Sequence, residues 1–293
     1  MRYYFLFLMW LIPARLVHAD NIAVFYALDE DLRALKASPG VRELGSPATV
    51  GTRSIHRLGL GPHHVYAMKM ASGSVETAMS AQALLATFRC DWAFSIGPAG
   101  SLDDSLEVGR WYRVERVVSW QSGSATSVGF QPSDRAAWDF DWDALPFETL
   151  EEQAGLHPDT YTPTMITLTS GEAFIASESE RTRLRHLMEA EAVDMNSFGL
   201  AAVCADHRVP LFIWRIISDR ADEEASETFR NFIASYDGHG GALLAEWIAH
   251  LPPNPDAPDT YPEIQKLLPP EDMEMMEILD SYRAPVYRNP DAP

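Results

Sequence analysis

Short apolar segments alternate with amphipathic ones along most of the chain. NIAVFYA at 21–27 is an apolar run typical of a buried strand, and the acidic LDEDLRAL that follows has the spacing of a helix. Residues 40–63 are rich in glycine, which favours turns and short strands. Further strands are predicted at 64–70, 92–96, 108–120, 165–169 and 209–217, and helices at 75–88, 177–190, 196–207, 223–235 and 241–251. This alternation predicts a central sheet covered by helices on both faces.

The first nineteen residues have the pattern of a secretory signal. Arg2 precedes the apolar run 3–12, and the segment 1–19 ends in VHA, whose small residues fit a signal-peptidase site. The run is too short to cross a bilayer as a mature helix. We therefore expect a signal peptide over 1–19 and a periplasmic or secreted protein, without stable membrane insertion after cleavage. The alternative is that the segment is an uncleaved anchor or that the start of the chain is wrongly assigned, in which case the protein is cytoplasmic.

Two other segments differ from the alternating pattern. Residues 252–293 are rich in proline and acidic side chains, which predicts an extension beyond a domain spanning 20–251. Residues 121–160 are predicted to be mostly loop. They carry aromatic side chains that we expect to be exposed and to supply part of an oligomer interface, namely Phe130, Trp138, Phe140, Trp142 and Phe147.

Composition narrows the partners and cofactors. A formal net charge of −19, from 42 acidic and 23 basic residues, argues against nucleic acid. Cys90 and Cys204 are too few for a disulfide scaffold and are expected to be buried free thiols. The pair His63-His64 and the glycine-flanked His239 lack a cysteine or acidic partner at a zinc-like spacing, so solvated loop histidines are expected and no metal site is assigned.

Four segments that follow predicted strands, or lead into a helix, carry the candidate chemistry. They are Gly97–Leu102, Ser170–Ile175, Val193–Ser197 and Arg215–Asp222. Their order resembles that in the nucleoside phosphorylase superfamily, most closely the 5′-methylthioadenosine/S-adenosylhomocysteine nucleosidases. Those enzymes show G-S/A-A-G-G/S-L, SGDxFI, VEMEx and RxISDxAD in turn. The resemblance covers about residues 21–250. It implies a single-domain, three-layer α/β/α sandwich with a mixed central sheet, a purine nucleoside substrate, no cofactor and a homodimer whose 5′ pocket a neighbour completes.

The resemblance assigns an acid to the purine end of the site. A purine leaves its sugar readily only when its N7 is protonated, and a carboxyl whose pKa is raised by burial can supply that proton. Asp219 matches the aspartate that takes this role, and Ser218 is assigned to the substrate site beside it. An N-cap for the next helix is the alternative for Asp219, although Asp222 is better placed for it.

Further residues match the family's substrate contacts. Phe174 matches the aromatic that stacks on the purine, and Ile175 the residue whose backbone meets the base edge. Pro98, Ala99 and Gly100 match a turn whose backbone runs close to ribose and base, which explains the small residues. Proline is unusual there because it removes an N–H donor. Ordinary core packing is the alternative for Phe174.

Two positions depart from the family pattern. Asp31 matches a glutamate that activates water against C1′, but its carboxylate is one methylene shorter. Asn196 stands where VEMEx has its second glutamate, beside Met195, which matches the methionine packed on the sugar. An amide accepts a hydrogen bond without carrying charge, so the sugar differs, turnover is slow, or activity is lost.

Three functions follow from these residues. The first is a purine nucleosidase that hydrolyses the N-glycosidic bond of an adenine-type nucleoside. The second is a phosphorylase, for which Arg53 and Arg57 lie in a suitable region but no glycine-rich arginine loop is present. The third is a weakly active or non-catalytic binding protein on the same fold.

Overall fold

The computed structural model describes residues 19–127, 129–133, 137–145 and 161–251. The sequence predictions for residues 1–18, for Phe147 and for the extension 252–293 lie outside these described residues. Among the described helices, none is both long enough and apolar enough to span a membrane.

The centre of the fold is a mixed β-sheet. Its strands are β1 (Asn21–Tyr26), β2 (Val41–Glu43), β3 (Ala48–Val50), β4 (Arg53–Leu60), β5 (His63–Lys69), β6 (Trp92–Ser101), β7 (Trp111–Ser119), β10 (Ala137–Asp139), β11 (Tyr161–Ser170), β12 (Ala192–Asp194) and β13 (Leu211–Asp219). β1 lies parallel between β5 and β6, β4 continues the sheet antiparallel to β5, and β13 runs parallel to β6 but antiparallel to β7. The predicted mixed sheet is confirmed.

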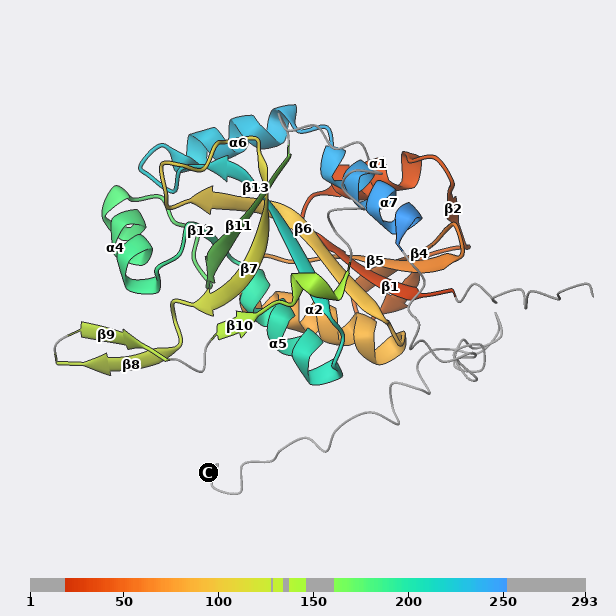
Figure 1. Ribbon diagram of the computed structural model, residues 1–293, viewed down its shortest axis with the longest axis horizontal. Helices are drawn as coiled ribbons and strands as arrows, with labels where there is room; N and C mark the ends of the chain where they lie inside the picture. The colour runs from red at the N-terminus through yellow and green to blue at the C-terminus, as the bar shows by residue number, and fades with distance from the viewer. Residues whose placement is uncertain (1–18, 128, 134–136, 146–160, 252–293) are drawn as a thin grey trace, which may run out of the picture. The chain divides into compact units, whose positions relative to one another are not determined.

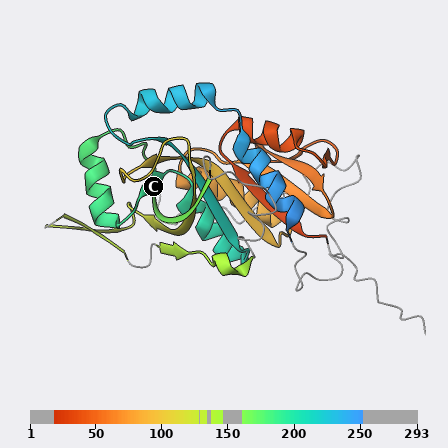
Figure 2. The same cartoon turned by 45° about the horizontal axis from the view of Figure 1, so that its top comes forward.

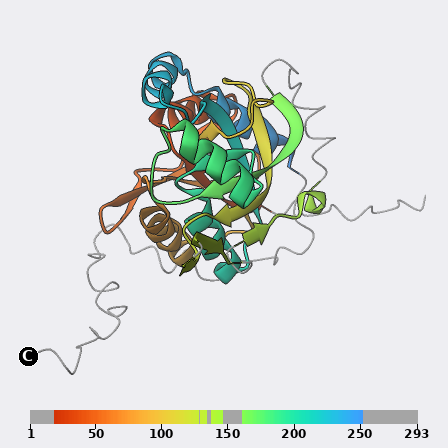
Figure 3. The ribbon, with the colours of Figure 1, turned by 90° about the vertical axis from the view of Figure 1, so that its left-hand side faces the viewer.

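Helices cover both faces of this sheet (Figures 1 and 2). They are α1 (Asp29–Ala37), α2 (Ser74–Thr87), α4 (Glu178–Met188), α5 (Ser197–His207), α6 (Ala225–Ser235) and α7 (His239–His250). α1 packs on α7 and α2 packs on α5, and these two pairs lie on opposite sides of the sheet in Figure 1. Figure 3 shows α4 in front of the sheet. The three-layer α/β/α fold is therefore confirmed.

A large aromatic cluster forms the core between β6, β13 and α7. Trp214 is fully buried, and its ring centroid lies 4.0 Å from that of Trp247 and 5.0 Å from that of Trp142. Trp142 belongs to the short 3-10 helix η1 (Trp142–Ala144), and its indole N–H donates to the carbonyl of Val114. The expectation that Trp142 is exposed is therefore wrong, because this segment folds back onto the core. The hairpin β8 (Gly123–Thr126) and β9 (Gly129–Pro132) instead projects away from the sheet in Figure 1.

The segment 97–100, expected as a turn, continues strand β6. It remains extended because β13 pairs with it, with Ile216 opposite Pro98 and Asp219 opposite Gly100. On the other side of β6, pairing with β1 ends at Ile96. Pro98 therefore lies beyond the residues that β1 pairs with, and its missing N–H costs little there. The strand thereby carries its small residues past the edge of the sheet.

The histidines and cysteines lie as follows. Cys90 and Cys204 are buried free thiols, as predicted. His63 is buried in β5, with Nδ1 3.4 Å from the carboxylate of Asp20, so the expectation that it is a solvated loop residue is wrong. His239 is partly exposed at the start of α7.

Candidate active site

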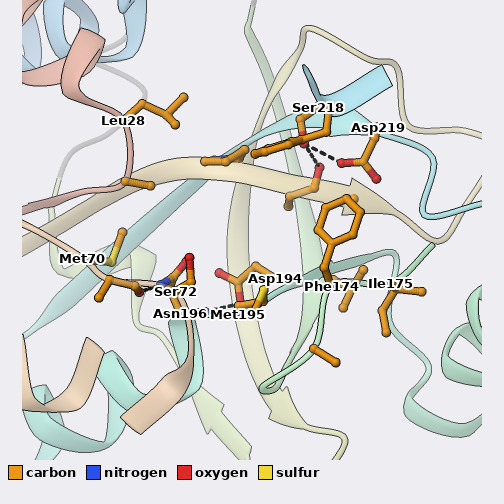
Figure 4. A pocket seen from close by; sticks show the side chains of 18 residues that line it. Leu28, Met70, Ser72, Phe174, Ile175, Asp194, Met195, Asn196, Ser218 and Asp219 are labelled. Carbon is orange, nitrogen blue, oxygen red and sulfur yellow. Dashed lines mark hydrogen bonds between the residues drawn. The ribbon is translucent and has the colours of Figure 1, made fainter. Parts of the chain in front are cut away.

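A cavity of about 320 Å³ opens at the carboxyl ends of β1, β6, β12 and β13, where an open α/β sheet binds its ligands. Its size suits a small organic molecule. All of the predicted site residues except Asp31 line this cavity: Pro98, Ala99, Gly100, Phe174, Ile175, Met195, Asn196, Ser218 and Asp219. Figure 4 shows Ser218 and Asp219 above the cavity and Met195 and Asn196 below it. The four segments that carry the candidate chemistry thus meet at one place.

Asp219 is a buried carboxyl in the cavity wall. Only 1% of the residue is exposed, and its Oδ1 accepts a hydrogen bond from the backbone N–H of Ala221 at 2.9 Å. The Ser218 hydroxyl lies 2.8 Å from Oδ2. Burial raises the pKa of Asp219, while these two hydrogen bonds lower it and only partly offset the desolvation. The result is a carboxyl biased toward its protonated form and open to the cavity.

A break in strand register brings Asp219 to this wall. Ile217 pairs with Ala99 and Asp219 with Gly100, so Ser218 is an extra residue that forms a bulge. A Cβ atom on Gly100 would lie 2.9 Å from Oδ1 of Asp219, so the small residue is needed for the close approach. Asp219 makes no capping bond to α6. Asp222 instead accepts from the N–H of Glu224, next to the start of that helix.

Two aromatic rings flank the cavity near the acid. Phe174 has 43% of its surface exposed, so core packing does not account for it. Its ring centroid lies 5.6 Å from that of Phe229, which α6 contributes. The two rings offer an apolar surface on which a planar base can stack.

The loop that carries Phe174 is fastened to the start of α2. Oε1 of Glu172 accepts hydrogen bonds from the N–H groups of Ser74 and Val75, at 2.9 and 3.3 Å. A carboxylate at a helix N-terminus is favourable because it meets unpaired N–H groups and the positive end of the helix dipole. Gly73 permits this contact, since its φ is +101° and a Cβ there would lie 2.4 Å from Oε2 of Glu172.

A buried ion pair supports the opposite end of the cavity. Asp194, at the end of β12, accepts a hydrogen bond from Nε of Arg215 at 2.9 Å, and both side chains are only 1% exposed. The other guanidinium nitrogens donate to Ser95 and Ser197. Asp194 also accepts from the backbone N–H groups of Asn196 and Ser197. This network fixes the start of α5 and neutralises the charge of Asp194.

The side-chain amide of Asn196 has a defined orientation. Its nitrogen donates to the carbonyl oxygen of Ala71 and to the hydroxyl oxygen of Thr77, the latter at 2.8 Å. The hydroxyl of Thr77 itself donates to Ala71 at 2.8 Å. Because a carbonyl can only accept, the nitrogen must face Ala71, and the amide oxygen remains for a ligand.

Asp31 is not among the residues that line the cavity, and its role in activating water against C1′ stays a prediction. It is 1% exposed between α1 and α7, and its Oδ1 accepts from the hydroxyl of Tyr236 at 2.5 Å. That hydroxyl in turn accepts from the N–H of Gly240 at 3.1 Å. Desolvation raises the pKa of Asp31 to about 7, although the bond from Tyr236 opposes the shift. The carboxyl of Asp31 is thus bonded to Tyr236, the residue at the C-cap of α6, and does not line the cavity.

Glycines explain how the two helices enclose Asp31. A Cβ atom on Gly241 would lie 1.8 Å from the carbonyl oxygen of Asp31, and one on Gly238 would lie 2.1 Å from that of Glu30. α7 therefore packs on the backbone of α1 without an intervening side chain. The GHGG sequence that begins α7 is a packing motif, so His239 is flanked by glycines for a structural reason.

Sequence reasoning missed Phe229, Thr77 and Tyr236. Phe229 and Tyr236 are seven residues apart, with α6 beginning at Ala225, which is one signal of a shared helix face. Thr77 gives no local signal, because its role depends on Asn196, 119 residues away. Within the described ranges, no group of three or more His, Cys, Asp or Glu side chains is placed to hold a metal ion.

The chain belongs to a known family. A family model described as the Phosphorylase superfamily matches residues 21–249, and the protein is a member of that family. The four segments recognised in the sequence all fall within the matched region.

Individual relatives and structures agree with this placement. The chain is 28% identical over 185 residues to a 5′-methylthioadenosine/S-adenosylhomocysteine nucleosidase of Staphylococcus carnosus, covering 61% of this chain and 78% of that protein. It is 27% identical to one of Lysinibacillus sphaericus, covering 79% and 100%. A futalosine hydrolase of Helicobacter pylori shares the fold with a TM-score of 0.68 at 20% identity, over 78% of this chain and 97% of that one. A 5′-methylthioadenosine/S-adenosylhomocysteine nucleosidase from Neisseria meningitidis, solved with methylthio-immucillin-A, gives a TM-score of 0.67 at 22% identity. That match covers 78% of this chain and 99% of the other.

Proposed function

We propose that this protein is a purine nucleosidase that hydrolyses the N-glycosidic bond of an adenine-type nucleoside. The observation that carries the proposal is the buried carboxyl of Asp219, which lines a cavity of suitable size beside an exposed aromatic ring. The relatives named as 5′-methylthioadenosine/S-adenosylhomocysteine nucleosidases support an adenine-type substrate.

The acid half of the reaction follows from this geometry. With the purine stacked on Phe174, Asp219 donates its proton to N7 as the bond between the base and C1′ breaks. The bonding electrons move into the base, which leaves neutral, and the sugar carbon becomes cationic. A water molecule then bonds to C1′ and loses a proton to solvent. Burial favours this reaction because it raises the pKa of Asp219 and so biases the carboxyl toward the protonated form that donates to N7.

Phosphate is not favoured as the nucleophile. Arg53 donates to Ser80 and forms an ion pair with Glu76 at 2.8 Å, and Arg57 donates to the carbonyl of Ser46. Among the described residues, the cavity lining contains no lysine or arginine. A phosphate dianion would therefore find no basic side chain in this lining to hold its charge.

A non-catalytic binding function is the second candidate. The observation that favours it is the position of Asp31, which leaves the lining without the carboxylate expected to activate water. Binding would still use Phe174 and Asp219, so the two candidates predict the same affinity for base but a different fate for the nucleoside.

A nucleoside panel tests the proposal. Purified protein is incubated with 5′-methylthioadenosine, S-adenosylhomocysteine and adenosine, with and without phosphate, and free adenine is measured. We expect release that does not depend on phosphate. Because Asp219 must be protonated, the rate should fall as pH rises through its pKa. Binding without release supports the second candidate, and release that requires phosphate contradicts hydrolysis.

We further propose a homodimer that involves α2. Val75 and Met79 lie one turn apart on this helix, with 64% and 50% of their surfaces exposed, next to residues 70–72 of the cavity. Apolar side chains exposed at such a spacing favour an interface. Light scattering should give twice the chain mass, and Val75→Lys should give monomers. A wild-type monomer at micromolar concentration contradicts this proposal.

Export from the cytoplasm is also proposed, from the pattern of residues 1–19. The mature N-terminus should be Asp20, the first residue after the VHA sequence. N-terminal sequencing of the periplasmic or secreted product tests this, and an intact Met1 in the cytoplasmic fraction contradicts it.

A further inference from the structure

The end of the cavity opposite Asp219 presents a neutral hydrogen-bond acceptor. Both protons of the Asn196 amide nitrogen are used, one by Ala71 and one by Thr77. Thr77 is fully buried, so solvent does not compete for its hydroxyl. The amide oxygen is therefore the part of Asn196 that a ligand can meet, and it offers no proton and no charge.

The neighbouring carboxylate does not supply a free charge either. Asp194 lines the cavity, but Arg215 lies 2.9 Å from it and the hydroxyl of Ser197 donates to it at 2.6 Å. Two backbone N–H groups complete its bonding. A ligand hydroxyl that approached Asp194 would have to displace one of these buried partners, which is costly.

We propose that this end of the cavity binds the sugar through one neutral acceptor, and that the protein therefore accepts purine 2′-deoxyribonucleosides at least as well as ribonucleosides. The inference rests on the proposed function, because stacking the base between Phe174 and Asp219 places the sugar at Asn196 (Figure 4). It deepens that function by naming the sugar class.

Ribose and 2′-deoxyribose differ in what they lose when the acceptor is neutral. A carboxylate gains from both hydroxyls of a ribose, because charge-assisted bonds are about twice as strong as neutral ones. A site built around such bonds rejects an analogue that lacks a hydroxyl, since a buried group is left unpaired. The oxygen of Asn196 remains satisfied by the single ring hydroxyl of a 2′-deoxy sugar. The glycosidic bond of that sugar also ionises more easily, because no electron-withdrawing hydroxyl adjoins C1′.

The test measures kcat/KM for adenosine and 2′-deoxyadenosine on the wild-type protein. We expect the ratio of deoxy to ribo substrate to be one or greater. A preference for adenosine of about tenfold or more would overturn the inference, since it would show a subsite that depends on the second hydroxyl.

Two variants locate the effect at Asn196. Asn196→Asp introduces a negative charge in a side chain of the same size. It should shift the ratio toward adenosine by about tenfold. Asn231→Asp is the matched control: it makes the same change at an exposed position of α6 that does not line the cavity, so the ratio should stay within about twofold of wild type. A folded Asn196→Asp protein with an unchanged ratio contradicts the inference, and if this variant does not fold, the wild-type ratio decides.

Binding separates this inference from the proposed function. If no adenine is released from either nucleoside, dissociation constants for the same two compounds are measured by calorimetry on the wild type. Equal or tighter binding of 2′-deoxyadenosine then supports the neutral sugar subsite while the nucleosidase proposal fails. Adenosine binding about tenfold tighter overturns the subsite whatever the turnover.

Discussion

Asp219 and Asp31 are both buried carboxyls whose pKa is raised by desolvation, yet they belong to different environments. Asp219 ends β13 and lines the cavity, with bonds from Ala221 and Ser218 close by in the chain. Asp31 lies between two helices and receives its bond from Tyr236, 205 residues away. Both carboxyls are buried and the pKa of each is raised, but only Asp219 lines the cavity.

The difference shows that a raised pKa does not by itself indicate a catalytic group. Perturbed carboxyls occur both in active sites and in structural contacts. Asp31 matches a family position by sequence, but its shorter side chain bonds to Tyr236 instead of lining the cavity. Replacing either carboxyl should therefore affect different properties, activity for Asp219 and stability for Asp31.

The largest effect is expected for Asp219→Asn. This change removes the proton donor but keeps the size of the side chain, so base release should fall by about 100- to 10,000-fold. Nucleoside affinity should change by a few-fold at most, as measured by calorimetry. Asp31→Asn is the matched control, and it should keep most of the activity. Equal losses in both variants would contradict the distinction between the two carboxyls.

Asp31 should instead control the pH dependence of stability. Its pKa is raised from 3.8 to about 7 on folding, so the folded protein holds a proton that the unfolded chain releases. The contribution of this proton to the free energy of unfolding is fully present below pH 4. It is lost progressively as pH rises from 4 through 7, by up to about 4 kcal/mol. Denaturant unfolding should show wild type losing stability over this range relative to Asp31→Asn. Parallel curves for the two proteins would show that Asp31 does not titrate in this way.

Tyr236→Phe tests the hydrogen bond that Asp31 receives. The variant leaves Asp31 buried without its hydrogen bond, which should lower the free energy of unfolding by about 1–3 kcal/mol. Turnover should remain near that of wild type when measured well below the melting temperature. A specific loss of kcat in a stable variant would link Asp31 and Tyr236 to the chemistry after all.

Phe174→Ala should weaken nucleoside binding by about 1–3 kcal/mol, the usual contribution of stacking on a base. The free energy of unfolding should change little, because the ring is 43% exposed. Calorimetric titration with adenine measures the first quantity and thermal melting the second. Unchanged affinity would remove Phe174 from the base subsite.

The smallest effect is expected for Glu172→Gln. The amide still accepts from Ser74 and Val75, but without charge, so the loop that carries Phe174 is held less firmly. KM should rise by about twofold to fivefold with kcat unchanged, because the two charge-assisted bonds become neutral. A fall in kcat of the same size would indicate a role in the chemistry instead.

Much of the fold could be predicted because its elements have local signals. β1 and α2 follow from apolar runs and helical spacing, and both lie within a residue or so of the expected bounds. Segment 97–100 was expected as a turn because glycine and proline usually end strands, whereas pairing with β13 keeps it extended. That pairing joins residues more than a hundred positions apart, and no local pattern shows it.

The candidate site shows the same limit. The motifs located Asp219, Phe174 and Asn196 at one cavity, because each follows or ends a strand of the same sheet. The position of Asp31 depends on Tyr236, and the orientation of Asn196 depends on Thr77. Side-chain partners so distant in the chain are determined by packing, which only the folded structure reveals.

The close packing of α7 on α1 has a consequence for how the chain matures. The contact joins the second element of the chain, at residues 29–37, to the last described helix, at 239–250. Gly238 and Gly241 meet the backbone of α1 directly, so in the folded domain this surface of α1 is covered by a segment close to the domain's end. A nascent chain must therefore keep one side of α1 uncovered until almost the whole domain has been synthesised. Folding should finish late and in one step, and a protein truncated before residue 239 should depend on chaperones or be degraded.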